Sequence, residues 1–296
     1  MFTRALLAGG IVALFVGSWI GRASLRSPRV VEGPPGGAPR RIVSMAPSVT
    51  EMLFALDLGD RVVGVTRFCN YPEAAAELPR VGGHLDPNLE AILRLRPELV
   101  AMLDEQQDLA ESLNKLGVHT LTVSDDSVGQ ILDAIAILGA RCGAAPRAEQ
   151  LVGDLRARTE AVRRRTEGLP APSVLVVVDR SLGTGTIEDA YVAGHDAYFE
   201  ELIAMAGGRN AYRGPAIPYP VVSVEGMIRI APEVIIDLAA GRAAAGPEGA
   251  LADWRRFPQI EAVARGQVYA LDAGYAMIPG PRFVLLLEAL AERIHE

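Results

Sequence analysis

The sequence predicts an α/β fold of two lobes, each with a parallel sheet, joined by one long helix. Short apolar runs alternate with helical segments, which is typical of a parallel sheet covered by helices on both faces. A long, charged and almost uninterrupted helical segment at 146–169 separates two blocks of this pattern. A short stretch of the first block recurs in the second, which indicates that the two lobes are related.

The first lobe is expected to span residues 41–145. It opens with the apolar run 41–45, which we expect to be a buried strand. A helix should begin near 47, with Ser48 as its N-cap and Glu51 completing a capping box. After a loop rich in aromatic and turn residues, the pattern continues with strands at 61–66, 98–103 and 119–123, and with helices from Asp86-Pro87 and over 106–116.

The connecting helix and the second lobe follow. Residues 146–169 carry apolar side chains on one stripe, and a helix of roughly twenty residues would be about 30 Å long. The strand pattern restarts at 173–179, inside a second lobe of residues 170–296. An ordinary surface helix within a single domain is the alternative interpretation of 146–169.

The internal repeat is the strongest signal in the sequence. EAILRLRPELVAML at 90–103 aligns without a gap with EGMIRIAPEVIIDL at 225–238. Each copy predicts a short helix, a proline break and an apolar strand. Glu90 and Glu225 fall in the first turn of their helices, where the helix dipole favours a carboxylate by about 0.3–1 kcal/mol. The alternative is that the two charges dock onto arginines of a two-fold symmetric partner.

The N-terminus has the features of an export segment. Residues 5–20 are uncharged and mostly apolar, and Arg4 makes the preceding segment positive. We therefore expect residues 1–23 to be a cleaved signal peptide or an uncleaved membrane anchor, and both alternatives stay open. Residues 24–40 are rich in Pro, Gly and Arg and predict a flexible linker. No cysteine follows the apolar run, which excludes attachment as a lipoprotein.

Composition narrows the class of function. The net charge of −7 argues against nucleic acid as the main partner, because phosphate binding needs a basic surface. Two cysteines, Cys69 and Cys142, are expected to be free thiols, and four scattered histidines offer no metal site. No phosphate-binding loop, nucleophile elbow or complete dinucleotide fingerprint occurs. We therefore expect neither an enzyme nor an intrinsic cofactor.

Several segments resemble the periplasmic substrate-binding proteins of ABC transporters, and within them the branch that binds cobalamin, siderophores and haem. The resemblance extends over about residues 41–290 and rests on RIVSMAPSVTE at 41–51, GDRVVGV at 59–65, CNYP at 69–72, AGGRN at 206–210 and YPVVSVE at 219–225. It implies two Rossmann-like lobes joined by a single backbone helix, with the ligand in the cleft between them. It also implies a monomer, periplasmic or otherwise extracytoplasmic, that delivers its ligand to a permease dimer with an ATPase.

The same resemblance implies roles for individual residues. Glu90 and Glu225 match the lobe-tip glutamates that engage arginines on the permease. Cleft aromatics of the cobalamin branch pack on the corrin ring, and His84 and Leu103 replace tryptophans that are common there. The expected ligand is cobalamin or a related corrinoid, and the candidate ligand-binding residues are Phe68, Tyr71, His84, Tyr191, Tyr219 and Tyr275.

Other functions remain open at this stage. Haem is one alternative ligand, with an axial ligand drawn from His84, His195, Tyr71, Tyr191 or Tyr219. An anionic ferric siderophore is another, held by arginines among Arg67, Arg180, Arg213 and Arg282. A third is a membrane-anchored sensor or scaffold that keeps the fold but feeds no permease.

Overall fold

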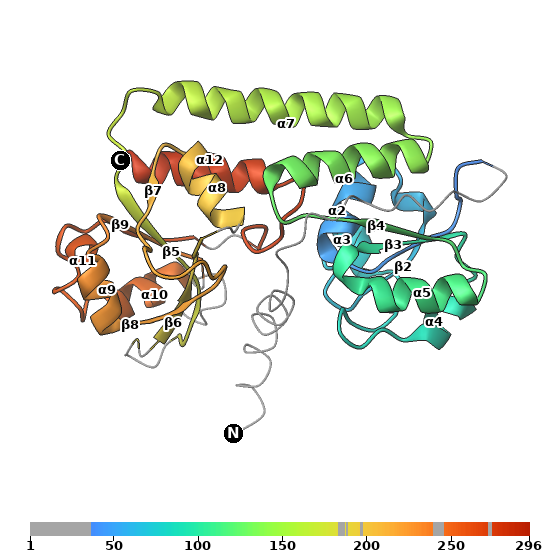
Figure 1. Ribbon diagram of the computed structural model, residues 1–296, viewed down its shortest axis with the longest axis horizontal. Coiled ribbons are helices and arrows are strands. Elements are labelled where there is room, and N and C mark those ends of the chain that lie inside the picture. Colours follow the sequence, from blue (N-terminus) through green and yellow to red (C-terminus); the bar gives the residue numbers. More distant parts are fainter. Residues whose placement is uncertain (1–36, 183–186, 188, 196–197, 239–245, 272–273) are drawn as a thin grey trace. The chain divides into compact units, whose positions relative to one another are not determined.

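The computed structural model describes residues 37–182, 187, 189–195, 198–238, 246–271 and 274–296 (Figure 1). The predicted export segment at 1–23 and most of the linker lie outside these residues. Among the described helices, none is long and apolar enough to cross a membrane. The chain divides into two compact units, Met1–Leu155 with Pro279–Pro281, and Arg156–Ile278 with Arg282–Glu296, called here the N-lobe and the C-lobe.

The N-lobe is built on a parallel four-stranded sheet in the order β2-β1-β3-β4. Its core is formed by Val43, Val100 and Met102 from the strands, by Met45 directly after β1, and by Ile92 and Leu113 from the helices. The strands are β1 (Ile42–Ser44), β2 (Val62–Val65), β3 (Leu99–Leu103) and β4 (Thr120–Val123). The helices are α2 (Pro47–Ala55), α3 (Glu73–Ala76), α4 (Leu89–Arg94), α5 (Gln107–Lys115) and α6 (Val128–Arg141), with 3-10 turns η1 (Gly59–Arg61) and η2 (Asp104–Gln106).

Two helix starts differ from the sequence prediction. The N-cap of α2 is Ala46, without a side-chain hydrogen bond, and Pro47 occupies the first turn. The predicted capping box is therefore wrong: a proline preorganises the entry into the helix, and Ser48 is buried inside the first turn. Helix α4 begins after Asn88, whose side chain caps the amide of Ala91 at 2.9 Å.

Helix α7 (Ala145–Thr166) is a continuous helix of 22 residues that begins in the N-lobe and ends in the C-lobe. Within the C-lobe, Arg158 forms two hydrogen bonds of 2.9 and 2.8 Å with the carboxylate of Glu288 on α12 (Phe283–Ile294). Such bidentate pairs have well-defined geometry. This pair therefore fixes the second half of α7 on α12.

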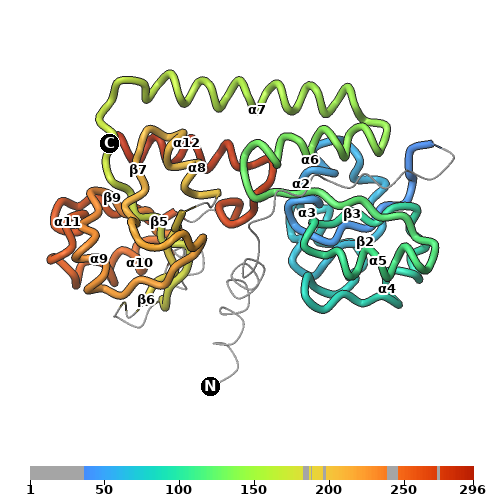
Figure 2. Tube along the Cα trace, viewed as in Figure 1, coloured from blue at the N-terminus to red at the C-terminus, as the bar shows by residue number. Residues whose placement is uncertain are grey.

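The C-lobe contains a second sheet, in the order β10-β9-β5-β6-β8, with β7 also pairing with β5. Figure 2 shows the course of the chain through β5, β6, β7 and β9. Its strands are β5 (Ser173–Arg180), β6 (Asp189–Val192), β7 (Arg209–Asn210), β8 (Val221–Ser223), β9 (Val234–Asp237) and β10 (Val268–Ala270). Its helices besides α12 are α8 (Tyr198–Met205), α9 (Val224–Ile230), α10 (Gly246–Trp254) and α11 (Glu261–Ala264). The core of this lobe contains strand residues such as Leu175, Val177, Val192 and Ile235.

The predicted α/β fold class is confirmed, with one refinement in the C-lobe. Strand β6 runs antiparallel to both β5 and β8, so this sheet is mixed rather than fully parallel. Too few residues separate β5 from β6 for a helical crossover, and a short connection can only return the chain antiparallel.

The internal repeat is reproduced in the backbone. Arg96 and Ala231 occupy the same position in the two copies, directly before the proline, and both have φ of 47°. Glu98 accepts a hydrogen bond from the amide of Arg40 at 2.6 Å, and Glu233 accepts one from the amide of Ser173 at 2.7 Å. Each glutamate thus holds the chain where it enters the first strand of its lobe. This second pair of repeat glutamates is explained by the fold itself.

Candidate functional site

The carboxyl edge of the N-lobe sheet is where this fold places a ligand site. Strand order β2-β1-β3-β4 puts a topological switch between β1 and β3, and open α/β sheets bind ligands outside the carboxyl ends of strands at such a point. The segments that leave these strands begin at Met45, Thr66, Asp104 and Ser124. Side chains of these segments form the candidate site of the N-lobe.

Phe68 and Tyr71 follow β2 at this edge. The Arg67 guanidinium lies 5.1 Å from the centroid of the Phe68 ring and forms an ion pair of 2.5 Å with Asp86. That ion pair lowers the pKa of the Asp86 carboxyl. Phe68 is half-buried, and Tyr71 is 49% exposed. Both rings therefore keep surface that a ligand can cover.

His84 is joined to the turn after β3. Its Nε2 lies 2.9 Å from Glu105, and its carbonyl accepts a hydrogen bond of 3.4 Å from Gln106. The amide of Arg67 donates to the carbonyl of Gly82 at 2.9 Å, so the segments carrying Phe68 and His84 are held together. The structure thus brings these two predicted residues to one edge of the N-lobe.

Four carboxylic acids lie just beyond the ends of β3 and β4, and one of them, Glu105, pairs with His84. They are Asp104, Glu105, Asp125 and Asp126. Asp104 accepts a hydrogen bond of 2.9 Å from the Ser124 hydroxyl. Burial raises the pKa of Asp125 to about 8, and the neighbouring carboxylates Asp126, Glu105 and Asp104 add to the rise. A hydrogen bond from Ser48 opposes it. Asp125 is therefore protonated at neutral pH within an otherwise negative edge.

The C-lobe candidates Tyr191 and Tyr219 lie on or beside the antiparallel strands. Tyr191 is half-buried on β6. Tyr219 is only 8% exposed and meets the ring of Phe199 edge-on, with 6.3 Å between centroids. The loop before β8 is fixed by the amide of Gly194, which donates to Pro218, and by buried Asn210, which donates to the Gly194 carbonyl.

His195 and Tyr275 are each engaged by a charged neighbour. The Nδ1 atom of His195 lies 2.9 Å from Glu200, and its ring is 5.6 Å from that of Tyr212. The pair with Glu200 leaves Nε2 of His195 as the nitrogen available to a ligand. Tyr275 is half-buried, with the guanidinium of Arg282 5.7 Å from its ring centroid.

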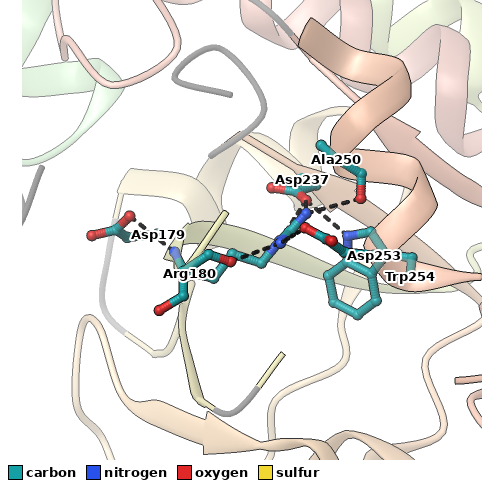
Figure 3. A network of polar contacts seen from close by, with 7 residues as sticks. Asp179, Arg180, Asp237, Ala250, Asp253 and Trp254 are labelled. Atoms are coloured by element: carbon teal, nitrogen blue, oxygen red, sulfur yellow. Dashed lines mark hydrogen bonds and ion pairs between the residues drawn. The ribbon is translucent and has the colours of Figure 1, made fainter. Parts of the chain in front are cut away.

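Arg180, a candidate for binding an anionic chelate, is instead enclosed in the C-lobe (Figure 3). Its side chain has no exposed surface and forms ion pairs of 2.8 Å with Asp237 and 2.9 Å with Asp253. The carbonyl of Ala250 accepts a further hydrogen bond of 3.0 Å, and the Trp254 indole donates to Asp237 at 2.8 Å. Arg180 therefore joins the ends of β5 and β9 to α10.

Glu90 and Glu225 are exposed on the first turns of α4 and α9. Neither side chain forms a hydrogen bond or ion pair with another described residue. Ser223 is the N-cap of α9, and its side chain accepts a hydrogen bond from the amide of Gly226 at 3.3 Å. The backbone amides of each helix start are thus capped by Asn88 and Ser223, and the fold requires no carboxylate beside them.

Sequence reasoning missed the acidic edge of the N-lobe and the anchor at Asn210. A signal for Asp104, Glu105, Asp125 and Asp126 was present, since each lies in the short segment that follows an expected parallel strand. Their convergence follows from the strand order, in which β3 and β4 are neighbours. Asn210 ends the AGGRN segment, but its role as an anchor could not be predicted, because its partners lie 16 and 17 residues earlier.

Comparison with known proteins places the chain in a family. The family model described as periplasmic binding protein matches residues 42–275. An uncharacterized ABC transporter substrate-binding lipoprotein of Bacillus subtilis, YvrC, is 28% identical over 87% of this chain and 80% of its own length. A vitamin B12-binding protein of Vibrio cholerae is 29% identical over 82% of this chain and 84% of its own.

A solved structure has the same architecture. The periplasmic heme-binding protein RhuT of Roseiflexus sp. RS-1 superposes with a TM-score of 0.73 and 28% identity, over 88% of this chain and 98% of that protein. Relatives named for B12 and for haem are thus equally similar, and overall similarity does not select the ligand. The match over most of its length shows that this chain belongs to the periplasmic binding proteins of the ABC importer family.

Proposed function

We propose that this protein captures cobalamin or a related corrinoid outside the cytoplasm and delivers it to a membrane permease. The observation that carries the choice of ligand is the acidic edge of the N-lobe, where the carboxylates of Asp104, Glu105 and Asp126 lie beside the protonated Asp125. A corrinoid presents neutral amide groups, whose N–H donors suit carboxylate acceptors. Haem presents propionates, which such an edge repels.

The arginines expected for an anionic chelate support the same choice. Arg180 is fully buried and paired with two aspartates, and Arg67 is paired with Asp86. Arg282 lies against the ring of Tyr275. These three guanidinium groups serve contacts within their own lobes, and only Arg213 of the four candidates is exposed without a described partner. A ferric siderophore bearing carboxylates would therefore find little compensation for its charge.

Aromatic side chains would supply the contact area for the corrin ring. Phe68 and Tyr71 retain exposed surface at the N-lobe edge, and Tyr191 and Tyr275 are partly exposed in the C-lobe. Large aromatic rings give apolar contact at low entropic cost, with few polar groups needed to orient the ligand. Tyr219 is the weakest of the candidates, because Phe199 already covers much of it.

Haem is the second candidate ligand, and one observation favours it. The pair of His195 Nδ1 with Glu200 resembles the carboxylate–histidine arrangement that orients metal-binding imidazoles. In this case Nε2 of His195 would be the axial ligand to the iron. The acidic N-lobe edge opposes this ligand, and the two possibilities make opposite predictions for binding.

We further propose that Glu90 and Glu225 dock onto arginines of the permease. Both are exposed, both occupy the same position of the repeat, and neither is used by its own lobe. The other repeat glutamates, Glu98 and Glu233, are fully accounted for by strand anchoring. A partner with two-fold symmetry would present matching arginines to the two positions.

Titration of the purified protein by calorimetry tests the ligand. We expect cyanocobalamin and cobinamide to bind in a one-to-one ratio and haemin and anionic ferric siderophores to bind at least tenfold more weakly. Phe68→Ala should weaken cyanocobalamin binding by at least tenfold, whereas Tyr269→Phe, on the C-lobe strand β10, should not. If haemin binds more tightly than cyanocobalamin, with a Soret shift that is lost in His195→Ala, the ligand is haem and not a corrinoid.

Uptake of radiolabelled cyanocobalamin in cells tests the docking glutamates. The double variant Glu90→Arg/Glu225→Arg should abolish accumulation and leave the affinity for cyanocobalamin unchanged. Charge reversal of Glu111 and Glu149, which are equally exposed on α5 and α7, is the matched control. Undiminished uptake by the double variant would remove the docking role, and binding without any uptake would favour a sensor or scaffold.

A further inference from the structure

A pocket of about 510 Å³ lies in the C-lobe beside Glu225. It is formed between β8, the first turns of α9 and the segment that follows β7. Strand β8 is the last strand of the sheet among the described residues, so one side of it is not covered by another strand (Figure 1). The residues that line it include Val221, Val222, Gly226, Arg229, Ile230 and Arg213.

The walls of the pocket combine an apolar floor with two cations. Val222 is buried, Ile230 is partly buried, and Val221 is 53% exposed at the entrance. Gly226 lets α9 pack closely on Val222, since a Cβ there would meet the Val222 side chain at 2.8 Å. Arg213 and Arg229 are exposed, and neither is paired with another described residue.

The charges around the pocket have a fixed order. Glu225 stands one helical turn before Arg229 on α9, so the two side chains project from one side of the helix. A complementary surface must therefore offer a cation to Glu225, a carboxylate to Arg229 and Arg213, and an aliphatic group to the pocket between them. A folded protein surface can carry these three groups together, whereas a small ion cannot.

We propose that this pocket receives an aliphatic side chain of the permease, next to an acidic residue that contacts Arg213 and Arg229. The inference rests on the proposed docking of Glu225 and adds the contact that gives it strength. An exposed ion pair alone contributes little to binding, because water screens it. In protein interfaces most of the binding energy comes from side chains that fill pockets, with charges arranged around them.

The repeat shows that this is a feature of the C-lobe copy alone. Val221 aligns with Asp86, which is engaged by Arg67, and Gly226 aligns with Ala91, which is buried. Arg229 aligns with Arg94, which is likewise exposed. Arg94 is therefore a matched control for Arg229, with the same residue type and the same position on a repeat-related helix.

Site-directed photo-crosslinking in living cells tests the proposal without knowledge of the ligand. A benzophenone amino acid is placed at position 221, at 225 as a reference, or at 228 as a control. Ile228 is 38% exposed on the same helix and does not line the pocket. We expect a light-dependent adduct with a membrane-spanning permease subunit from 221 and 225, and none from 228.

Each other outcome has a defined meaning. An adduct from 225 without one from 221 would overturn the pocket proposal and leave the docking of Glu225 intact. Absence of a permease adduct from both positions would overturn the docking function itself. An adduct from 221 with a second copy of this chain would show a dimer interface instead, and would also overturn the proposal.

Substitutions then measure the contact. The permease that the adduct identifies is then purified and held in nanodiscs, and its affinity for this protein is measured. Val221→Asp and Arg229→Glu should each weaken this affinity at least tenfold. Ile228→Asp and Arg94→Glu should change it less than threefold. Melting temperature and cyanocobalamin affinity, measured on the same variants, must stay unchanged. Equal losses in pocket and control variants would contradict the proposal.

Discussion

Arg180 and Asp237 form an ion pair of 2.8 Å in which neither side chain has any exposed surface. The Arg180 guanidinium forms a second ion pair with Asp253, and it donates further hydrogen bonds to the carbonyls of Ser181 and Ala250. A buried charge is tolerated only when its hydrogen-bonding capacity is met in this way. The network connects β5, β9 and α10, and its integrity should decide the stability of the C-lobe.

Arg180→Met should therefore destabilise the protein strongly. It leaves Asp237 and Asp253 buried without their cation, and the expected loss in the free energy of unfolding is about 3–5 kcal/mol. Arg265→Met is the control, since Arg265 and Glu261 form an exposed pair one turn apart, worth about 0.3–0.5 kcal/mol. Urea unfolding followed by circular dichroism measures both. Similar small losses in the two variants would contradict a buried charge network.

Asp125 should make stability depend on pH. Its carboxyl keeps a proton up to about pH 8 in the folded protein but loses it near the ordinary pKa of 3.8 when unfolded. Between these values the folded state binds more protons, so the free energy of unfolding falls as pH rises, by at most about 1.4 kcal/mol per pH unit. Above pH 8 this contribution to the slope ends.

Asp125→Asn should remove that dependence. The variant should gain stability relative to the wild type as pH rises from 5 to 8, in urea unfolding at matched ionic strength. Asp154→Asn, at an exposed carboxylate on α7 that takes no part in the environment of Asp125, is the control and should follow the wild type. Parallel curves for Asp125→Asn and the wild type would show that Asp125 ionises normally.

The left-handed residues of the repeat should be sites of stabilisation. Arg96 and Ala231 both have φ of 47°, a conformation that costs a side chain roughly 1–2 kcal/mol relative to glycine. Ala231→Gly and Arg96→Gly should therefore each raise the free energy of unfolding, by about 1 kcal/mol or less after the added entropy of the unfolded chain. Ala157→Gly, exposed in the middle of α7, should instead lower it by about 1 kcal/mol. A lower free energy of unfolding in all three variants would contradict the left-handed conformation of Arg96 and Ala231.

The two thiols should be unreactive in the folded protein. Cys69 and Cys142 are both free and buried, and burial raises the pKa of Cys142 to about 11 and also raises that of Cys69. Thiolate is the reactive form, so Ellman's reagent at pH 8 should find almost no thiol in native protein and two per chain in urea. Rapid reaction of one thiol in the native state would place it at the surface.

Much of the fold could be predicted because its signals are local. Apolar runs marked β1 to β5, and the charged segment from 146 marked α7. Helix α6 escaped the sequence analysis, although Ser127 caps it at 3.1 Å. Its buried side chains Ile131, Ile135 and Leu138 recur at helical spacing along one face, so a local signal for this helix was present in the sequence.

The candidate site could be predicted only in part, because its groups meet through tertiary structure. Phe68 and His84 belong to segments that approach each other through Arg67, Gly82 and Asp86. Arg180 was expected at a ligand, and its true partners lie 57 and 73 residues further along the chain. Burial and strand order, which no short motif encodes, decide whether an arginine meets a ligand or a core carboxylate.

The position of Trp254 also has a spectroscopic consequence. The chain has two tryptophans, and the other, Trp19, lies in the expected export segment. Trp254 is 1% exposed and hydrogen-bonded to Asp237, so the indole emission of a protein lacking residues 1–23 would arise from the C-lobe interior alone. A melting curve recorded by this emission would follow that lobe, whereas ellipticity follows the helices of both. The difference between the two curves would resolve the separate stabilities of the lobes without any added label.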